Sequence, residues 1–147
     1  MTDDAKRLID AARDAAQNAY APYSGFAVGA AILLSDGEIV TGANFENASY
    51  GLSLCAETVA MAKVGNLGRL GDVVAVGISG SPIGVDSEAA VHPCGRCRQI
   101  LNEAAQLGGR DLAVHCAGSS GDVYQTHHLS TLLPHAFGPA DLPPQKG

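Results

Sequence analysis

The chain has 147 residues, of which 46% are hydrophobic and 16% are charged, a composition typical of a globular domain and not of a disordered chain. Its formal net charge of −6 argues against nucleic acid polymers and anionic membranes as main partners, because both require clustered Lys and Arg. We expect residues 1–147 to form a single domain, with a tail from about residue 140 that is flexible or lies at a subunit interface.

The N-terminus predicts a cytoplasmic protein. It begins with the acidic stretch Met1-Thr2-Asp3-Asp4, no apolar signal region follows, and no apolar run is long enough to span a bilayer. In a reducing compartment, the four cysteines are expected to be metal ligands, catalytic groups or core residues rather than disulfides.

The order of predicted elements indicates an α/β fold. Apolar periodicity and turn residues predict helices at 3–18, 55–64, 93–106 and 130–133, strands at 28–34, 38–45, 72–78 and 112–116, a short extended piece at 123–125 and a surface loop at 80–92. The first two strands form a hairpin around Ser35-Asp36-Gly37, and the later strands alternate with helices. This order predicts a three-layer α/β/α sandwich around a mixed sheet.

Two cysteine segments carry the chemistry. Cys55-Ala56-Glu57 opens one predicted helix, and Pro93-Cys94-Gly95-Arg96-Cys97 opens another, 39 positions later. Helix N-termini stabilise thiolates, which are the form of cysteine that binds zinc. Three protein ligands with one open position are typical of catalytic zinc, and a carboxylate beside them can take a proton from water. We therefore predict a Zn²⁺ site at Cys55, Cys94 and Cys97, with Glu57 as the acid–base group.

Other interpretations of these residues stay open at this point. The cysteines could be a buried thiol and a redox Cys-x-x-Cys pair, or a structural zinc site with Cys116 as the fourth ligand. Glu57 could be a solvated helix residue. His92 could line the site or lie in a surface loop, and the spacing of His127 and His128 assigns them no role.

Several segments resemble the cytidine deaminase family, in its small, three-cysteine, homotetrameric class. The likeness extends over about residues 20–142. It rests on residues 21–24 (APYS), Phe26, 28–31 (VGAA), 44–51 (NFENASYG), 55–57 (CAE), 93–99 (PCGRCRQ) and 132–139 (LLPHAFGP).

The resemblance implies hydrolytic deamination of cytidine or 2′-deoxycytidine for pyrimidine salvage, with zinc held by the three cysteines. Glu57 would then carry the proton from water to N3 of the pyrimidine and on to the departing ammonia. Asn44 and Glu46 would hydrogen-bond the ribose, and the backbone N–H of Ala56 would bind the base.

The family likeness also assigns four aromatic residues to the substrate. Phe26 would pack on the pyrimidine face and Phe45 would belong to the substrate-binding segment. Tyr50 and Phe137 would reach the pocket of a neighbouring subunit, so the active site would be shared within a homotetramer.

One position departs from the family pattern. The family usually has Arg after Cys-Ala-Glu, and here the residue is Thr58. Zinc with three thiolates has a net negative charge, so the sulfurs need hydrogen-bond donors or a nearby cation. We expect Arg96 to supply this compensation, so that Arg96→Ala lowers turnover sharply and Thr58→Ala does little.

The departure leaves two further functions open. Blasticidin S deaminase, a relative, also lacks that Arg and has Cys-Gly-Arg-Cys, but it lacks the ribose segment at 44–50. The substrate could therefore be such an antibiotic or another aminopyrimidine nucleoside. A third possibility is a non-catalytic, zinc-stabilised oligomer that binds nucleosides.

Overall fold

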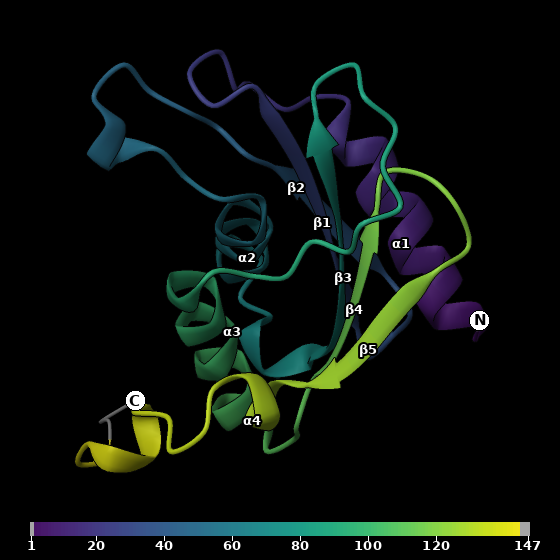
Figure 1. Cartoon of the computed structure of the whole chain (residues 1–147). Coiled ribbons are helices and arrows are strands. Elements are labelled where there is room, and N and C mark those ends of the chain that lie inside the picture. Colours follow the sequence, from purple (N-terminus) through teal and green to yellow (C-terminus); the bar gives the residue numbers. More distant parts are fainter. Residues whose placement is uncertain (1, 145–147) are drawn as a thin grey trace.

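The computed structural model describes residues 2–144, in which helices cover both faces of one five-stranded sheet (Figure 1). The α-helices are α1 (Asp3–Ala16), α2 (Ala56–Asn66), α3 (Gly95–Gly108) and α4 (Leu129–Leu132). The strands are β1 (Phe26–Leu34), β2 (Ile39–Ala43), β3 (Val73–Pro82), β4 (Ala113–Gly118) and β5 (Tyr124–His128). Single 3₁₀ turns are η1 (Tyr50–Leu52), η2 (Leu70–Asp72) and η3 (Pro139–Asp141).

The sheet is mixed, as predicted. Its strand order is β2-β1-β3-β4-β5, with β3 and β4 parallel and the other neighbours antiparallel. The parallel pair is possible because α3 lies in the connection between these two strands. The start of α3 therefore lies at one end of the sheet.

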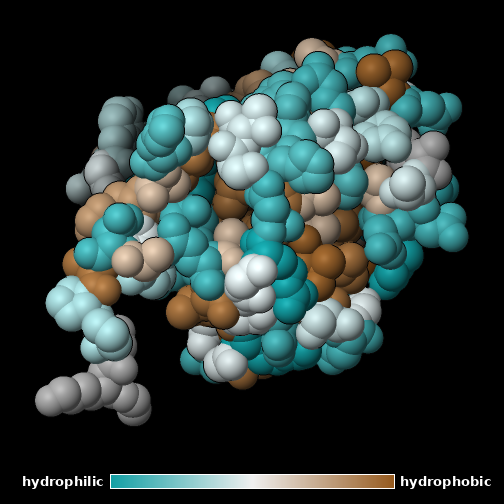
Figure 2. All heavy atoms as spheres, turned by 90° about the horizontal axis from the view of Figure 1, so that it is seen from below, coloured by the Kyte–Doolittle hydropathy of each residue, from teal (hydrophilic) through white to brown (hydrophobic). Residues whose placement is uncertain are grey.

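The three layers follow from two apolar clusters. On one face, α1 packs against β1 and β3 through small side chains, including Ala12, Ala31 and Ala75. On the other face, α2 and α3 cover a larger core that includes Ile32, Val76 and Leu101. Hydrophilic side chains cover most of the surface seen in Figure 2, with apolar groups between them. Among residues 2–144, no helix is long and apolar enough to cross a membrane.

Several element boundaries differ from the sequence-based predictions, most of them by one or two residues. β3 continues to Pro82, four residues beyond the predicted end, because β1 pairs with it over its whole length. β5 is a full edge strand where only a short extended piece was predicted, since its residues YQTHH lack an apolar alternation. The helix α1 ends at Ala16 rather than at Asn18. The predicted tail from about 140 begins within η3, and residues 145–147 of it lie outside the described residues.

Close approach of α1 to the sheet depends on a glycine. A Cβ atom added at Gly29 in β1 would overlap the backbone carbonyl oxygen of Ala12 in α1. The positions of the Cβ atom and of the Ala12 carbonyl oxygen are both fixed by the backbone, so a change of rotamer cannot relieve the overlap. Either the helix or the strand would have to shift.

We predict that Gly29→Ala lowers the free energy of unfolding by about 1–3 kcal/mol, because the added methyl group overpacks the α1–sheet interface. The control is Gly65→Ala in α2, where a Cβ meets only a side-chain carbon of Leu70 at 3.9 Å. That variant is expected to be as stable as the parent or more so, since Ala is the better helix former. Urea unfolding measures both, and equal stabilities would contradict the prediction.

Candidate metal centre and active site

Three thiols from two helix N-termini meet at one point. Cys55 is the N-cap of α2, Cys94 is the N-cap of α3, and Cys97 lies in the first turn of α3. Their sulfur atoms all lie within 4.8 Å of one another, and the Sγ atoms of Cys55 and Cys94 are 3.7 Å apart. Residues that are 39 positions apart in the sequence thus form one cluster.

The spacing fits a tetrahedral zinc ion. Zn–S bonds of about 2.3 Å at tetrahedral angles place neighbouring sulfurs about 3.8 Å apart, which agrees with the 3.7 Å between Cys55 and Cys94. Cys116 is fully buried in β4 outside this cluster, and burial raises the pKa of its thiol to about 12. The structure therefore does not support the alternative in which Cys116 is a fourth ligand.

The surroundings of the cluster favour a thiolate. A hydrogen bond from the Cys97 thiol lowers the pKa of Cys55 to about 6, with further contributions from Cys94 and from the charge of Arg96. The same hydrogen bond and burial raise the pKa of Cys97, so Cys97 is the proton donor of the pair. Because the thiolate is the metal ligand, this arrangement prepares the site for a cation.

Glu57 lies in the first turn of α2 with its side chain buried. Only 4% of the residue is exposed, which excludes the interpretation as a solvated helix residue. Burial, assisted by the negative charge of Cys55, raises the pKa of the carboxyl group to about 7. A carboxyl group that titrates near neutral pH can both accept and donate a proton.

Glu57 opens into a pocket of about 250 Å³ next to the thiols. Asn44, Glu46, Ala56 and His92 contribute to its walls, and so do Val28, Ser53, Leu54, Cys55, Val91 and Cys94. The pocket thus combines the thiols, the buried carboxyl group and two of the residues predicted to bind ribose. It also answers the question left open for His92, which lines the site.

Backbone groups hold the two polar residues of the predicted ribose segment. Asn44 Oδ1 accepts a hydrogen bond from the N–H of Val28 at 2.9 Å, and its Nδ2 donates to the carbonyl oxygen of Phe26 at 2.8 Å. Glu46 Oε1 accepts from the N–H groups of Tyr23 and Ser24 at 3.0 and 3.1 Å. Both side chains are therefore fixed at the pocket before any ligand is bound.

The four predicted aromatic residues do not line this pocket in the single chain. Phe45 is 52% exposed and lines another hollow, beside α2. Phe26 is half-buried in β1 and is absent from the pocket wall. Tyr50 is 72% exposed in η1, which projects away from the sheet in Figure 1, and its ring packs on that of Tyr23. Phe137 is 61% exposed near the C-terminus.

The structure reveals a role for Thr58 that sequence reasoning missed. Its hydroxyl oxygen lies 3.5 Å from the Sγ atom of Cys97, close enough for a hydrogen bond to sulfur. The N-cap position of Cys55 could have indicated this contact, since Thr58 is the third residue of the same helix and lies about one turn after Cys55. The small effect expected of Thr58→Ala on turnover stays a prediction, and the contact with Cys97 argues for a larger one.

The two nearby arginines act differently. Arg96 is exposed and affects the thiols through its charge, which lowers the pKa of Cys55. Arg98, two residues further along α3, donates instead to the carbonyl oxygens of Pro93 at 2.8 Å and Leu132 at 3.0 Å. Arg98 thereby anchors the start of α3 to the C-terminal segment.

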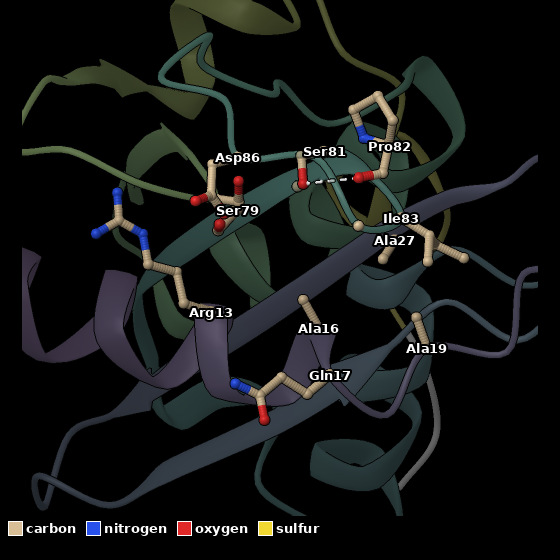
Figure 3. A pocket seen from close by; sticks show the side chains of 13 residues that line it. Arg13, Ala16, Gln17, Ala19, Ala27, Ser79, Ser81, Pro82, Ile83 and Asp86 are labelled. Carbon is tan, nitrogen blue, oxygen red and sulfur yellow. Dashed lines mark hydrogen bonds between the residues drawn. The ribbon is translucent and has the colours of Figure 1, made fainter.

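A second hollow, of about 350 Å³, lies between the C-terminal half of α1 and the end of β3, away from the thiols (Figure 3). Three of its polar side chains, those of Arg13, Ser79 and Ser81, already have backbone partners. Arg13 donates to the carbonyl oxygens of Gly118 and Gly121, and the hydroxyl groups of Ser79 and Ser81 donate to the carbonyl oxygens of Gly118 and Pro82. We therefore place the candidate active site in the smaller pocket, with the thiols and Glu57.

Comparison with known proteins identifies the family. Residues 2–108 match the family described as "Cytidine and deoxycytidylate deaminase zinc-binding region". A cytidine deaminase of Halalkalibacterium halodurans is 44% identical over 139 residues, covering 95% of this chain and 98% of that protein. This chain belongs to the cytidine deaminase family. A cytidine deaminase of Mycobacterium tuberculosis is 43% identical over 136 residues, covering 92% and 90% of the two chains.

Solved structures of the cytidine deaminase family have the same fold. The crystal structure of a cytidine deaminase from Burkholderia pseudomallei superimposes with a TM-score of 0.78 at 40% identity, covering 93% of this chain and 100% of that one. The structure of the enzyme from Mycobacterium tuberculosis gives a TM-score of 0.72 at 40% identity, covering 94% and 99%. The predicted α/β/α fold and family are therefore confirmed.

We predict that Cys55→Ser, Cys94→Ser and Cys97→Ser each lose most of the zinc that the parent protein carries, about one ion per chain, because each removes one of three thiolate ligands. Cys116→Ala is the matched control and is expected to retain its zinc, since that thiol lies outside the cluster. Mass spectrometric metal analysis of the purified proteins measures both. Zinc loss in the control together with retention in Cys94→Ser would refute this assignment.

Proposed function

We propose that this protein catalyses the hydrolytic deamination of cytidine and 2′-deoxycytidine, giving uridine or 2′-deoxyuridine and ammonia. The observation that carries the proposal is the burial of Glu57 beside three convergent thiols, in a pocket that also contains Asn44 and Glu46. An acid–base group, a metal-binding cluster and polar groups for a sugar are what this reaction requires.

Cys55, Cys94 and Cys97 would hold the zinc ion. Zinc bound by three protein ligands supplies Lewis-acid activation of a water molecule. The N-termini of α2 and α3 direct backbone N–H groups toward the sulfurs and reduce the cost of gathering negative charge there.

Glu57 moves the proton. As a carboxylate it accepts a proton from water, and as a carboxylic acid it donates that proton to N3 of the pyrimidine. It then takes the proton of the hydroxyl group added at C4 and donates it to the amino group, which leaves as ammonia. The pKa of about 7 supports both halves of this cycle, because neither protonation state is strongly disfavoured near neutral pH.

Three groups would orient the nucleoside. Ala56 is the first residue of α2, so its N–H has no acceptor within the helix and can bind the base. Asn44 keeps one N–H for the ribose, since its other polar positions are bonded to β1. Glu46 would accept hydrogen bonds from the ribose hydroxyl groups, held in place by the N–H groups of Tyr23 and Ser24.

We also propose a homotetramer with shared active sites. The exposure of the aromatic residues Tyr50 and Phe137 supports it, since large apolar side chains at the surface are typical of subunit interfaces. Phe26 and Phe45 would complete the substrate-binding surface, Phe26 against the pyrimidine and Phe45 through the segment that carries Asn44 and Glu46. We propose that the protein acts in pyrimidine salvage, because its reaction converts cytidine to uridine. We also propose that it is cytoplasmic and consists of a single domain.

Two observations weigh against the alternatives. Asn44 and Glu46 line the pocket, which favours a ribonucleoside or deoxyribonucleoside over an antibiotic without that recognition segment. The Thr58 hydroxyl group lies where it can donate to Cys97 once that residue is a thiolate, which favours an active enzyme over a non-catalytic nucleoside-binding oligomer.

The proposal is tested with purified, zinc-loaded protein and a panel of cytidine, 2′-deoxycytidine and blasticidin S, followed by ammonia release. We expect turnover of the first two. Glu57→Gln is expected to lower kcat by about 10²–10⁴-fold, because general acid–base catalysis contributes this much, while the zinc content is retained. Glu103→Gln on α3 is the matched control and should leave kcat unchanged. Activity on blasticidin S alone, or zinc-loaded protein that binds cytidine without releasing ammonia, would overturn the proposal.

Charge compensation at the thiols is tested by two variants. Thr58→Val removes the hydroxyl group at nearly constant volume and is expected to lower kcat about 10- to 100-fold, since a hydrogen bond to a charged group contributes about 1.5–3 kcal/mol. Arg96→Ala is expected to lower kcat less than tenfold, a smaller loss than the sharp one expected from the sequence, because the guanidinium group is exposed. Added salt should weaken this effect further.

The salt dependence separates the two contributions. Steady-state kinetics at low and high salt, with zinc content measured in parallel, should show a salt-dependent defect for Arg96→Ala and a salt-independent one for Thr58→Val. A parent-like kcat for Thr58→Val would show that its hydroxyl group does not support the site.

A further inference from the structure

A second cluster of metal-ligating atoms lies beside the candidate active site. The Nε2 atoms of His92 and His127 are 3.2 Å apart. The Oε1 atom of Gln125 lies 3.1 Å from His92 Nε2 and 3.2 Å from His127 Nε2. The three atoms therefore form a nearly equilateral triangle.

Two separate segments build this triangle. Gln125 and His127 are two residues apart on β5, so their side chains point to the same face of the sheet. His92 belongs to the segment that leads into α3, and its ring contacts Gln125 and His127 on that face of the sheet. The intervening residue Thr126 points to the other face, where its hydroxyl group bonds to His115 at 2.9 Å. His128 also lies on that other face, in a hollow with Thr2 at the start of α1.

Hydrogen bonds alone cannot satisfy the three atoms. Each imidazole Nε2 either carries a proton or presents a lone pair, and the Gln125 oxygen can only accept. If both rings are protonated at Nε2, two N–H groups face each other across 3.2 Å. If one is protonated, the other ring nitrogen faces the amide oxygen with lone pairs on both atoms. Every assignment leaves at least one side of the triangle unfavourable.

A cation at the centre removes this conflict, because all three atoms then direct a lone pair at it. Metal–ligand bonds of about 2.1 Å at near-tetrahedral angles place neighbouring donor atoms about 3.4 Å apart, within about 0.3 Å of the observed 3.1–3.2 Å. Two imidazoles bound along their Nε2 lone pairs at this length would have ring centroids about 5 Å apart. The centroids of His92 and His127 are 5.1 Å apart.

We propose that His92, His127 and Gln125 form a second metal site, which binds a borderline divalent ion such as Zn²⁺ or Ni²⁺. Two imidazole nitrogens and one amide oxygen are suited to these ions rather than to Mg²⁺ or Ca²⁺. His92 and Gln125 are exposed, so water completes the coordination shell. The site is distinct from the cysteine centre, since it uses neutral ligands and needs no thiolate.

The position of the second site connects it to the first. His92 belongs to the wall of the candidate substrate pocket and precedes the zinc ligand Cys94 by two residues. An ion held by His92 would therefore lie at the rim of that pocket and fix the segment that leads into α3. The proposal does not depend on the deamination reaction, because binding is measured without substrate.

The test uses the full chain, purified without a polyhistidine tag and loaded with zinc at the cysteine centre. Isothermal titration calorimetry with further Zn²⁺, and separately with Ni²⁺, is expected to show about one additional ion per chain. His92→Asn and His127→Asn should each weaken this second binding at least tenfold. His128→Asn is the matched control, since it removes the neighbouring imidazole on the opposite face of β5, and it should bind like the parent.

The zinc retained at the cysteine centre reports that each variant is folded and keeps the first site, so failure of the second site is distinguished from failure of the proposed function. Absence of an additional ion in the parent would overturn the proposal. Unchanged binding in His92→Asn and His127→Asn would overturn it too, as would loss of binding in His128→Asn.

Discussion

The candidate active site depends on two helices that begin at the same point above one face of the sheet. Packing of α2 and α3 on the core around Ile32, Val76 and Leu101 sets the distance between their N-termini. Those N-termini carry Cys55 and Cys94 as caps, so the position of the helices decides whether the sulfurs can share an ion. The sheet therefore positions the thiols through the helix starts, while Val28 of β1 contributes to the wall of the pocket.

The balance of charge around the sulfurs is the second constraint. Three thiolates and a carboxylate in one pocket repel each other unless donors surround them. The helix N–H groups, the Thr58 hydroxyl group near Cys97 and the charge of Arg96 share this task. Burial of Glu57 reduces the repulsion further, because its raised pKa lets it hold a proton next to the thiolates.

The sequence patterns predicted the elements with strong local signals well and those with weak ones poorly. The helix starts at the two cysteine segments follow from cap residues and helical periodicity, and both are confirmed. The edge strand β5 was underestimated because YQTHH is polar and gains its strand conformation from pairing with β4. The orientation of Phe45 away from the pocket depends on packing beside α2, which no local pattern records.

The sequence by itself determined the chemical groups: three cysteines and one glutamate at the spacing of a zinc deaminase, within an α/β order of elements. It could do so because ligand type and local spacing are properties of short segments. Only the tertiary structure decided that Thr58 reaches Cys97, that Arg98 is used as an anchor, and that His92 meets Gln125 and His127. These contacts join residues 33 to 39 positions apart or depend on how two elements pack, so they arise only when the whole sheet has formed.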